Sequence, residues 1–162
     1  MKYRRDSAQY RIYGKDYSKI GIYSVTICTL RETNPFGEID SGKMILNEYG
    51  KIVDDNWNNL LTAFNTIELD EFVVMPNHFH GIIKIIIDGG KPLGEMVRYF
   101  KARSCRMIHK AGFEDFAWKP RYYDNIIRNN YELNNVEWYI RKNPKKVEEE
   151  LEKIRNGFDK AQ

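Results

Sequence analysis

The sharpest chemical feature of the sequence is a pair of histidines separated by one residue, His78-Phe79-His80. If this segment is a strand, successive side chains point to opposite faces, so both imidazoles lie on one side and Phe79 packs on the other. Two neutral imidazoles on one face chelate a divalent transition metal when one or two further ligands join them. Two unrelated histidines beside a turn would give the same short pattern, so the motif alone leaves both interpretations open.

A tyrosine and an asparagine four residues apart, Tyr139 and Asn143, form the second feature. Positions four apart share one face of a helix, so the hydroxyl and the amide would project together. A phenol is a candidate nucleophile, and an amide oxygen is a candidate hard ligand for a metal. A helical tyrosine also packs into cores, so this pair by itself does not establish a site.

The elements that position these residues follow from the hydrophobic pattern. Strands are predicted at about 21–30, 67–75, 80–87 and 121–127, and helices in the latter part of 47–65, from Pro92 onwards, over 131–143 and over about 146–154. We expect Pro144 to end the third of these helices, because a proline disfavours the helical conformation of the residue before it. The order of elements predicts an α+β domain with a mainly antiparallel sheet in the split βαβ (ferredoxin-like) arrangement, with helices packed on it.

The 162 residues predict one domain, with a basic arm over 1–20 and a short charged helix over 145–162. Charge is unevenly spread, with a net charge of −7 over residues 32–71 and of +5 over residues 91–128. This asymmetry is typical of a protein with one phosphate-binding face, although solvated helices also carry charge. The two cysteines, Cys28 and Cys105, fit no metal or redox spacing.

The first eleven residues contain no apolar stretch typical of a signal peptide, and no run approaches the length of a membrane span. We therefore expect a cytoplasmic protein with no membrane partner.

Four blocks, in this order, resemble the REP-associated tyrosine transposases, which belong to the single-tyrosine HUH transposases of the insertion-sequence 200-like superfamily. The blocks are MPNHFHGIIKI (75–85), RYFKARS (98–104), WKPRYYDNIIRN (118–129) and YIRKNP (139–144). The opening strand GIYSVTICT and the later PFGEI segment are similar too, so the resemblance runs from about Tyr17 to Lys145.

The resemblance implies roles for individual residues. His78 and His80 match the paired metal ligands, Asn143 matches the third ligand, and Tyr139 matches the nucleophile on a C-terminal helix. Tyr123 is kept as the rival nucleophile. The metal would be Mg²⁺ or Mn²⁺; imidazole ligands suit manganese better than magnesium, which prefers oxygen, and zinc could bind as well.

The resemblance also implies a substrate, single-stranded DNA that folds into a hairpin and is cut and rejoined through a 5′-phosphotyrosine during DNA transposition. Basic residues on the helix that begins near Pro92, and on the segment after it, would contact the DNA backbone. These are Arg98, Lys101, Arg103, Arg106, Lys119 and Arg121. The sequence identifies no general base for the phenol, and it leaves a monomer and a homodimer open.

Two other functions remain as alternatives. The chain could be a non-catalytic or domesticated protein of the same fold that binds DNA hairpins. It could also be a hydrolase that activates a water at the histidine pair, in which case no covalent protein–DNA adduct would form.

Overall fold

The structure, a computed structural model, describes residues 15–159. Most of the expected basic arm, and the last three residues of the expected charged tail, lie outside the described residues. The elements are β1 (Gly21–Cys28), β2 (Gly37–Asp40), β3 (Lys43–Leu46), α1 (Glu48–Asn58), α2 (Leu60–Ala63), β4 (Ile67–Val74), β5 (His78–Ile85), α3 (Leu93–Lys110), β6 (Tyr123–Ile127) and α4 (Asn130–Asp159).

Four strands form one antiparallel sheet in the order β4-β5-β1-β6, and β2 and β3 form a separate hairpin. The chain enters at β1, crosses by α1 to β4, returns through β5 between them, and crosses by α3 to β6. This is the split βαβ arrangement, so the α+β class and the topology expected from the sequence are confirmed. It makes β5 a central strand, bonded on both edges.

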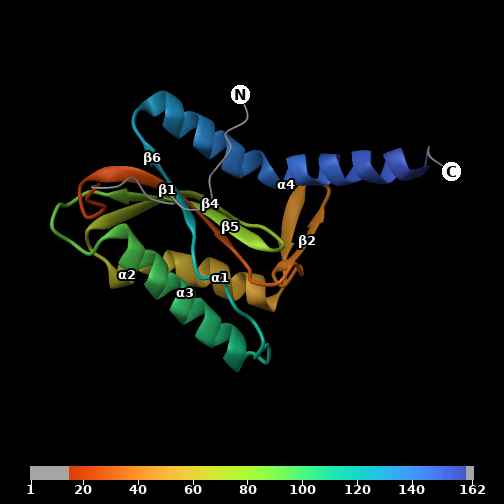
Figure 1. Ribbon diagram of the computed structural model, residues 1–162, viewed down its shortest axis with the longest axis horizontal. Coiled ribbons are helices and arrows are strands. Elements are labelled where there is room, and N and C mark those ends of the chain that lie inside the picture. The colour runs from red at the N-terminus through yellow and green to blue at the C-terminus, as the bar shows by residue number, and fades with distance from the viewer. Residues whose placement is uncertain (1–14, 160–162) are drawn as a thin grey trace.

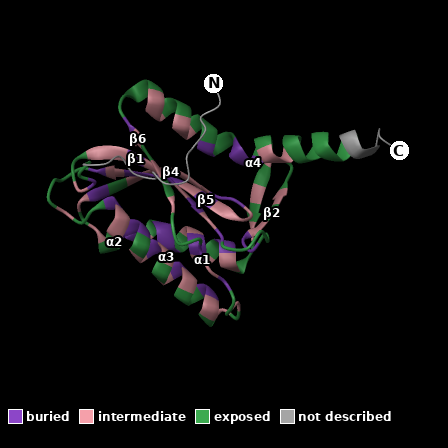
Figure 2. Cartoon of the chain, viewed as in Figure 1, coloured by how far each residue is buried: buried purple, intermediate pink, exposed green. Residues whose placement is uncertain are grey.

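Helices α1 and α3 cover one face of this sheet and α4 lies across the other (Figure 1). The main core lies under α1 and α3, where Trp57 of α1 contacts Phe79 of β5 and Phe100 of α3, with ring centroids 4.5 and 5.3 Å apart. Buried residues concentrate in that layer, whereas the far half of α4 is exposed (Figure 2). The large core therefore fixes the position of β5 from the face opposite to α4.

A smaller apolar cluster attaches α4 to the other face of the sheet. Ile140 of α4 is 2% exposed and packs with Ile82 of β5 and Ile127 of β6. None of the helices within residues 15–159 combines the length and the apolar composition that a membrane crossing requires.

The expected helix end at Pro144 is wrong, because α4 is one helix from Asn130 to Asp159 with Pro144 inside it. A proline removes the hydrogen bond that its own N–H would donate, here to the carbonyl of Ile140, and its ring crowds that carbonyl, which can bend a helix without ending it. The residues that follow are mostly good helix formers, lysine, glutamate and leucine, and they continue the helix. The helix changes direction about half-way along its length (Figure 1).

The hairpin of β2 and β3 was not predicted from the sequence. Its strands have only four residues each, and the turn between them places Ser41 and Gly42 at φ angles of 51° and 73°. Two consecutive residues with positive φ are typical of the two-residue turns that join antiparallel strands. The hairpin reaches α4, where a Cβ added to Gly42 would lie 3.4 Å from Cβ of Lys145.

Candidate active site

The histidine pair lies on β5 with the alternation that the sequence predicts. His78 and His80 point to the face covered by α4, and their ring centroids are 4.8 Å apart with the planes at 86°. Phe79 between them points the other way and is fully buried in the main core. The core contact of Phe79 therefore holds the two imidazoles on the opposite face.

Each imidazole is oriented by a hydrogen bond at Nδ1. His78 Nδ1 lies 2.7 Å from the amide oxygen of Asn77, and His80 Nδ1 lies 2.8 Å from the hydroxyl of Thr26 on the neighbouring strand β1. An amide oxygen only accepts hydrogen bonds, so Nδ1 of His78 carries the proton and Nε2 keeps its lone pair. Partners of this kind fix the ring and the tautomer of metal-binding histidines.

The surroundings keep both imidazoles neutral. Burial lowers the pKa of His78. Burial, together with the nearby His78, lowers the pKa of His80 from 6.5 to about 3. A neutral imidazole is the form that binds a metal, so the pair is ready for ligation at neutral pH.

Tyr139 of α4 lies beside this pair. Its ring centroid is 5.5 Å from that of His80, with the planes at 80°, and its side chain is 43% exposed. Across the described residues, no hydrogen bond is made to the Tyr139 hydroxyl. The position follows from packing, because Ile140 contacts Ile82, which is the next residue after His80 on the same face of β5.

An ion pair adds a second connection between α4 and the sheet. Nη1 of Arg141 donates to the Glu71 carboxylate of β4 at 2.8 Å. Pairs exposed to this degree contribute little to stability, but this one restricts how α4 is rotated over the sheet.

Asn143, one helical turn after Tyr139, is 4% exposed, and its Nδ2 is buried without a hydrogen-bond partner. Leaving a buried amide N–H unpaired costs roughly 1–3 kcal/mol. Because no bond to Nδ2 fixes the amide, it can turn over and exchange its oxygen and nitrogen. The described residues contain no group of three His, Cys, Asp or Glu side chains that could hold a metal ion. Two imidazoles and one amide oxygen would together make a mixed nitrogen and oxygen donor set of the kind that divalent ions accept.

The alternative tyrosines are less well placed. Tyr123 of β6 pairs with Thr26, which pairs with His80, so Tyr123 shares the face of the histidines at two strand spacings, roughly 10 Å away along the sheet. Tyr131 is 77% exposed near the start of α4, and Tyr122 packs against the main core on the other face. Tyr139, by contrast, has its ring against that of His80.

Comparisons with known proteins identify the family of this chain. The family described as "Transposase IS200 like" matches residues 43–143, which include His78, His80, Tyr139 and Asn143. The chain belongs to the IS200-like transposase family. An uncharacterised protein of Haemophilus influenzae strain Rd is 32% identical over 154 residues, covering 83% of this chain and 86% of the relative.

Two solved structures resemble this IS200-like chain in fold. One is a REP-associated tyrosine transposase bound to a REP hairpin, with a TM-score of 0.65 and 21% identity, covering 86% of this chain and 74% of the other. The other is a candidate transposase of Deinococcus radiodurans R1, with a TM-score of 0.50 and 18% identity, covering 80% of this chain and 95% of the other.

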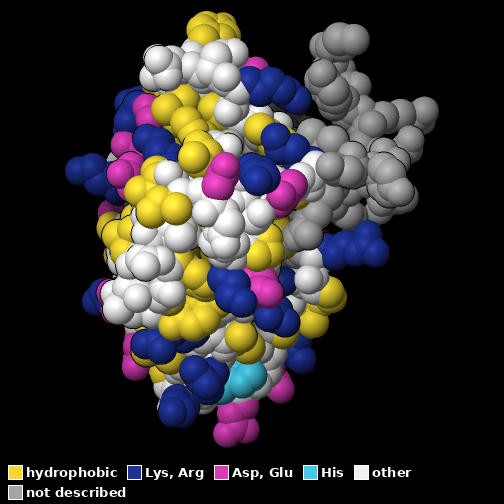
Figure 3. Space-filling model, turned by 90° about the vertical axis from the view of Figure 1, so that its left-hand side faces the viewer, with side chains coloured by type: hydrophobic (Ala, Val, Ile, Leu, Met, Phe, Trp, Pro, Cys, Tyr) yellow, Lys and Arg dark blue, Asp and Glu magenta, His cyan; other side chains and the backbone are white. Residues whose placement is uncertain are grey.

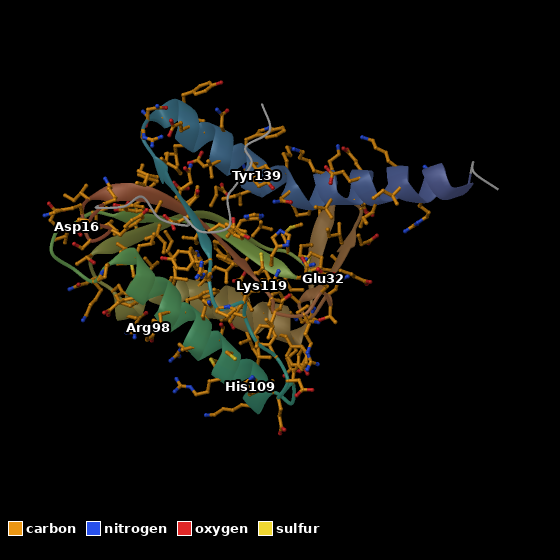
Figure 4. The ribbon with its side chains drawn as sticks, in the orientation of Figure 1. Asp16, Glu32, Arg98, His109, Lys119 and Tyr139 are labelled. Atoms are coloured by element: carbon orange, nitrogen blue, oxygen red, sulfur yellow. The ribbon has the colours of Figure 1, made fainter. Side chains whose placement is uncertain are left out.

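The basic residues expected from the sequence divide into two groups in this transposase fold. Lys119 lies two strand spacings, roughly 10 Å, from His78, because its N–H donates to the carbonyl of Cys28 at 2.8 Å and Cys28 pairs with His78 across the sheet. The basic residues of α3 lie on the far side of the sheet from Tyr139, as the labelled Arg98 shows in Figure 4. Lys and Arg side chains gather at the lower end of one face, where α3 lies (Figure 3).

Within that group, Arg98 and Lys101 line a hollow of about 450 Å³ between α3 and the segment 117–122. Lys101 Nζ donates to the carbonyls of Lys119 and Pro120, so this cation is partly used to hold the segment in place. Arg106 and Arg121 are exposed, whereas Arg103 is half-buried.

Sequence reasoning missed three residues of the site. Asn77 and Thr26 orient the histidines, and Lys146 of α4 places its Nζ 5.5 Å from the centroid of the Tyr139 ring. The strand alternation of β1 could have indicated Thr26 only if its pairing with β5 were known. Lys146 was hidden by the expected helix end at Pro144.

Proposed function

We propose that this chain is a metal-dependent endonuclease and strand transferase that acts on hairpin-forming single-stranded DNA through a 5′-phosphotyrosine at Tyr139. The observation that supports the proposal is the ring contact between Tyr139 and His80, with 5.5 Å between centroids, because it puts the candidate nucleophile beside the candidate metal-ligand pair. The likeness in fold to a transposase bound to a REP hairpin supports hairpin DNA as the substrate and the REP-associated group as the branch of the family.

The chemistry follows from this arrangement. His78, His80 and Asn143 would hold a divalent ion, Mg²⁺ or Mn²⁺, which supplies Lewis acidity at a non-bridging phosphate oxygen. Oη of Tyr139 bonds to phosphorus, and the bond from phosphorus to the 3′ oxygen breaks. The phenol proton passes to water, and the departing oxygen takes up a proton and leaves as a 3′ hydroxyl. Rejoining reverses these changes, so no nucleotide cofactor is needed.

Among the basic residues predicted from the sequence, Lys119 is best placed to hold the DNA near the cut, because it lies at the His78 end of β5 and β1. The cations of α3, on the other side of the sheet, would serve the duplex or flanking parts of the DNA. A single chain supplies both the histidines and the tyrosine, so the proposed reaction needs no second copy.

The test is a denaturing gel of labelled hairpin DNA incubated with Mn²⁺ and the wild type, Tyr139→Phe or Tyr123→Phe. We expect a covalent adduct with the wild type and with Tyr123→Phe, and none with Tyr139→Phe. Cleavage that persists without an adduct would indicate a metal-bound water as the nucleophile. Hairpin binding by every variant, with no cleavage by any of them, would indicate the non-catalytic DNA-binding function.

A further inference from the structure

Lys146 is the cation in the described residues that contacts the ring of Tyr139. Its Nζ lies 5.5 Å from the ring centroid, within the range of a cation–π contact. Lys146 is exposed, so its ammonium is free to meet a ligand that arrives at the tyrosine hydroxyl.

The continuity of α4 through Pro144 produces this contact. Tyr139 and Lys146 are seven residues apart in one helix, close to two full turns, so they share a face. Helical side chains lean towards the helix N-terminus, which directs the long lysine side chain back over the tyrosine. A helix that ended at Pro144 would not place the two residues in this relation.

The described neighbours of the Tyr139 ring differ in chemistry. His80 stands edge-on to the ring, with the two planes at 80°. Glu71 and Arg141, two of the charged groups in the contact between α4 and β4, form an ion pair. Lys146, which forms no ion pair with another described residue, brings a positive charge to the ring.

We propose that Lys146 contacts the scissile phosphate directly and stabilises the charge that the phosphate oxygens carry while Tyr139 attacks. The proposal rests on the proposed function, in which Tyr139 is the nucleophile. Phosphoryl transfer is accelerated mainly by positioning and by fixed cations at the phosphate oxygens. An ammonium that already borders the nucleophile meets this requirement without any rearrangement of the backbone.

The test compares Lys146→Met, Lys146→Arg and the wild type on two hairpin substrates under single-turnover conditions. One substrate has the natural phosphodiester at the cleavage site, and the other has an uncharged methylphosphonate there. We expect Lys146→Met to slow adduct formation about 10- to 100-fold on the phosphodiester. On the methylphosphonate we expect Lys146→Met to slow adduct formation less than threefold, because this substrate lacks the phosphate charge that Lys146 would contact.

Two control variants complete the design. Lys146→Arg keeps the cation and should recover the rate to within about threefold of the wild type. Lys153→Met removes the same charge from the same helix, roughly 10 Å beyond Lys146 and roughly 20 Å from Tyr139, and should leave the rate unchanged.

An equal loss on both substrates would show that Lys146 only supports the position of the ring, and it would overturn the proposal. No loss on either substrate would do the same. If the wild type does not cleave the methylphosphonate, the test rests on Lys146→Arg and the phosphodiester. A rate for this variant as low as that of Lys146→Met would overturn the phosphate contact. Tyr139→Phe separates the two proposals: an adduct that survives this substitution refutes the proposed function, whereas its loss together with full activity of Lys146→Met refutes only the role of Lys146.

Discussion

The ring of Tyr139 meets the ring of His80 edge-on within one chain, although 59 positions separate the two residues in the sequence. A strand from the middle of the chain and a helix from its end supply the two halves of the site. The contact needs no partner subunit, which decides how mutant proteins should behave when they are mixed.

We expect no complementation between His80→Ala and Tyr139→Phe. If each tyrosine serves the histidines of its own chain, a mixture of the two variants contains no complete site and forms no adduct. The measurement is adduct formation on hairpin DNA with the variants mixed at equal concentration and each alone. Recovery of about a quarter to a half of the wild-type yield would indicate exchange of tyrosines between copies in a dimer.

Thr26→Val should weaken Mn²⁺ binding about tenfold, because it removes the hydroxyl at Nδ1 of His80 while it keeps the shape of the side chain. Thr26→Ser keeps the hydroxyl and should bind as the wild type does. Calorimetric titration of Mn²⁺ into the three proteins measures the effect. Equal affinities for the valine variant and the wild type would show that packing alone orients the ring.

The metal-free protein should lose stability in acid partly through His80. Its pKa is about 3 in the fold and near 6.5 when the chain is unfolded. The unfolded state therefore binds more protons below pH 6.5, and the stability that the neutral form provides above that pH is lost as the pH falls towards 3. We expect this group to lower the free energy of unfolding by up to about 1.4 kcal/mol per pH unit.

Urea titrations in EDTA between pH 7 and 5, for the wild type and His80→Asn, measure this contribution. The asparagine variant should show a shallower dependence on pH. Identical slopes would mean that His80 is protonated in the folded protein at an ordinary pH.

Ile140→Ala should loosen α4 without unfolding the sheet. Ile140 is buried against Ile82 and Ile127, and removing such a side chain costs roughly 2–5 kcal/mol in a well-packed core. Hydrogen exchange should speed up for amides of residues 131–143 and stay unchanged in β5, which the main core holds. Leu151→Ala, an exposed position of the same helix, is the control. Equal protection of α4 in both variants would contradict the role of this cluster.

Those relations within the site that depend on the period of a single strand or helix were predictable from the sequence. The alternation of a strand fixes the common face of His78 and His80, and the pitch of a helix relates Tyr139 to Asn143. Neither period predicts that Tyr139 of the second pair lies beside His80 of the first. That contact depends on packing between residues far apart in the sequence, such as Ile82 and Ile140. The resemblance to a family supplied that link.

The errors have local causes. Pro144 indicates a helix end by its own preferences, but contacts beyond it and a run of helix formers override the loss of one hydrogen bond. The hairpin of β2 and β3 carries too few residues in each strand for an alternating pattern to stand out. Hydrogen bonds such as that of Thr26 depend on the register of two strands, which the sequence does not state.

The small hairpin has a consequence for how such enzymes diversify. Its turn contacts α4 beside Lys145, so its length sets the height at which the far half of that helix stands above the sheet. Adding one residue to each strand would raise that support by about 3.3 Å. A change of length far from the histidines would therefore shift the half of α4 that carries Lys146, so insertions and deletions in this hairpin are a route by which members of the family can move that lysine while the packing of Ile140 holds Tyr139 in place.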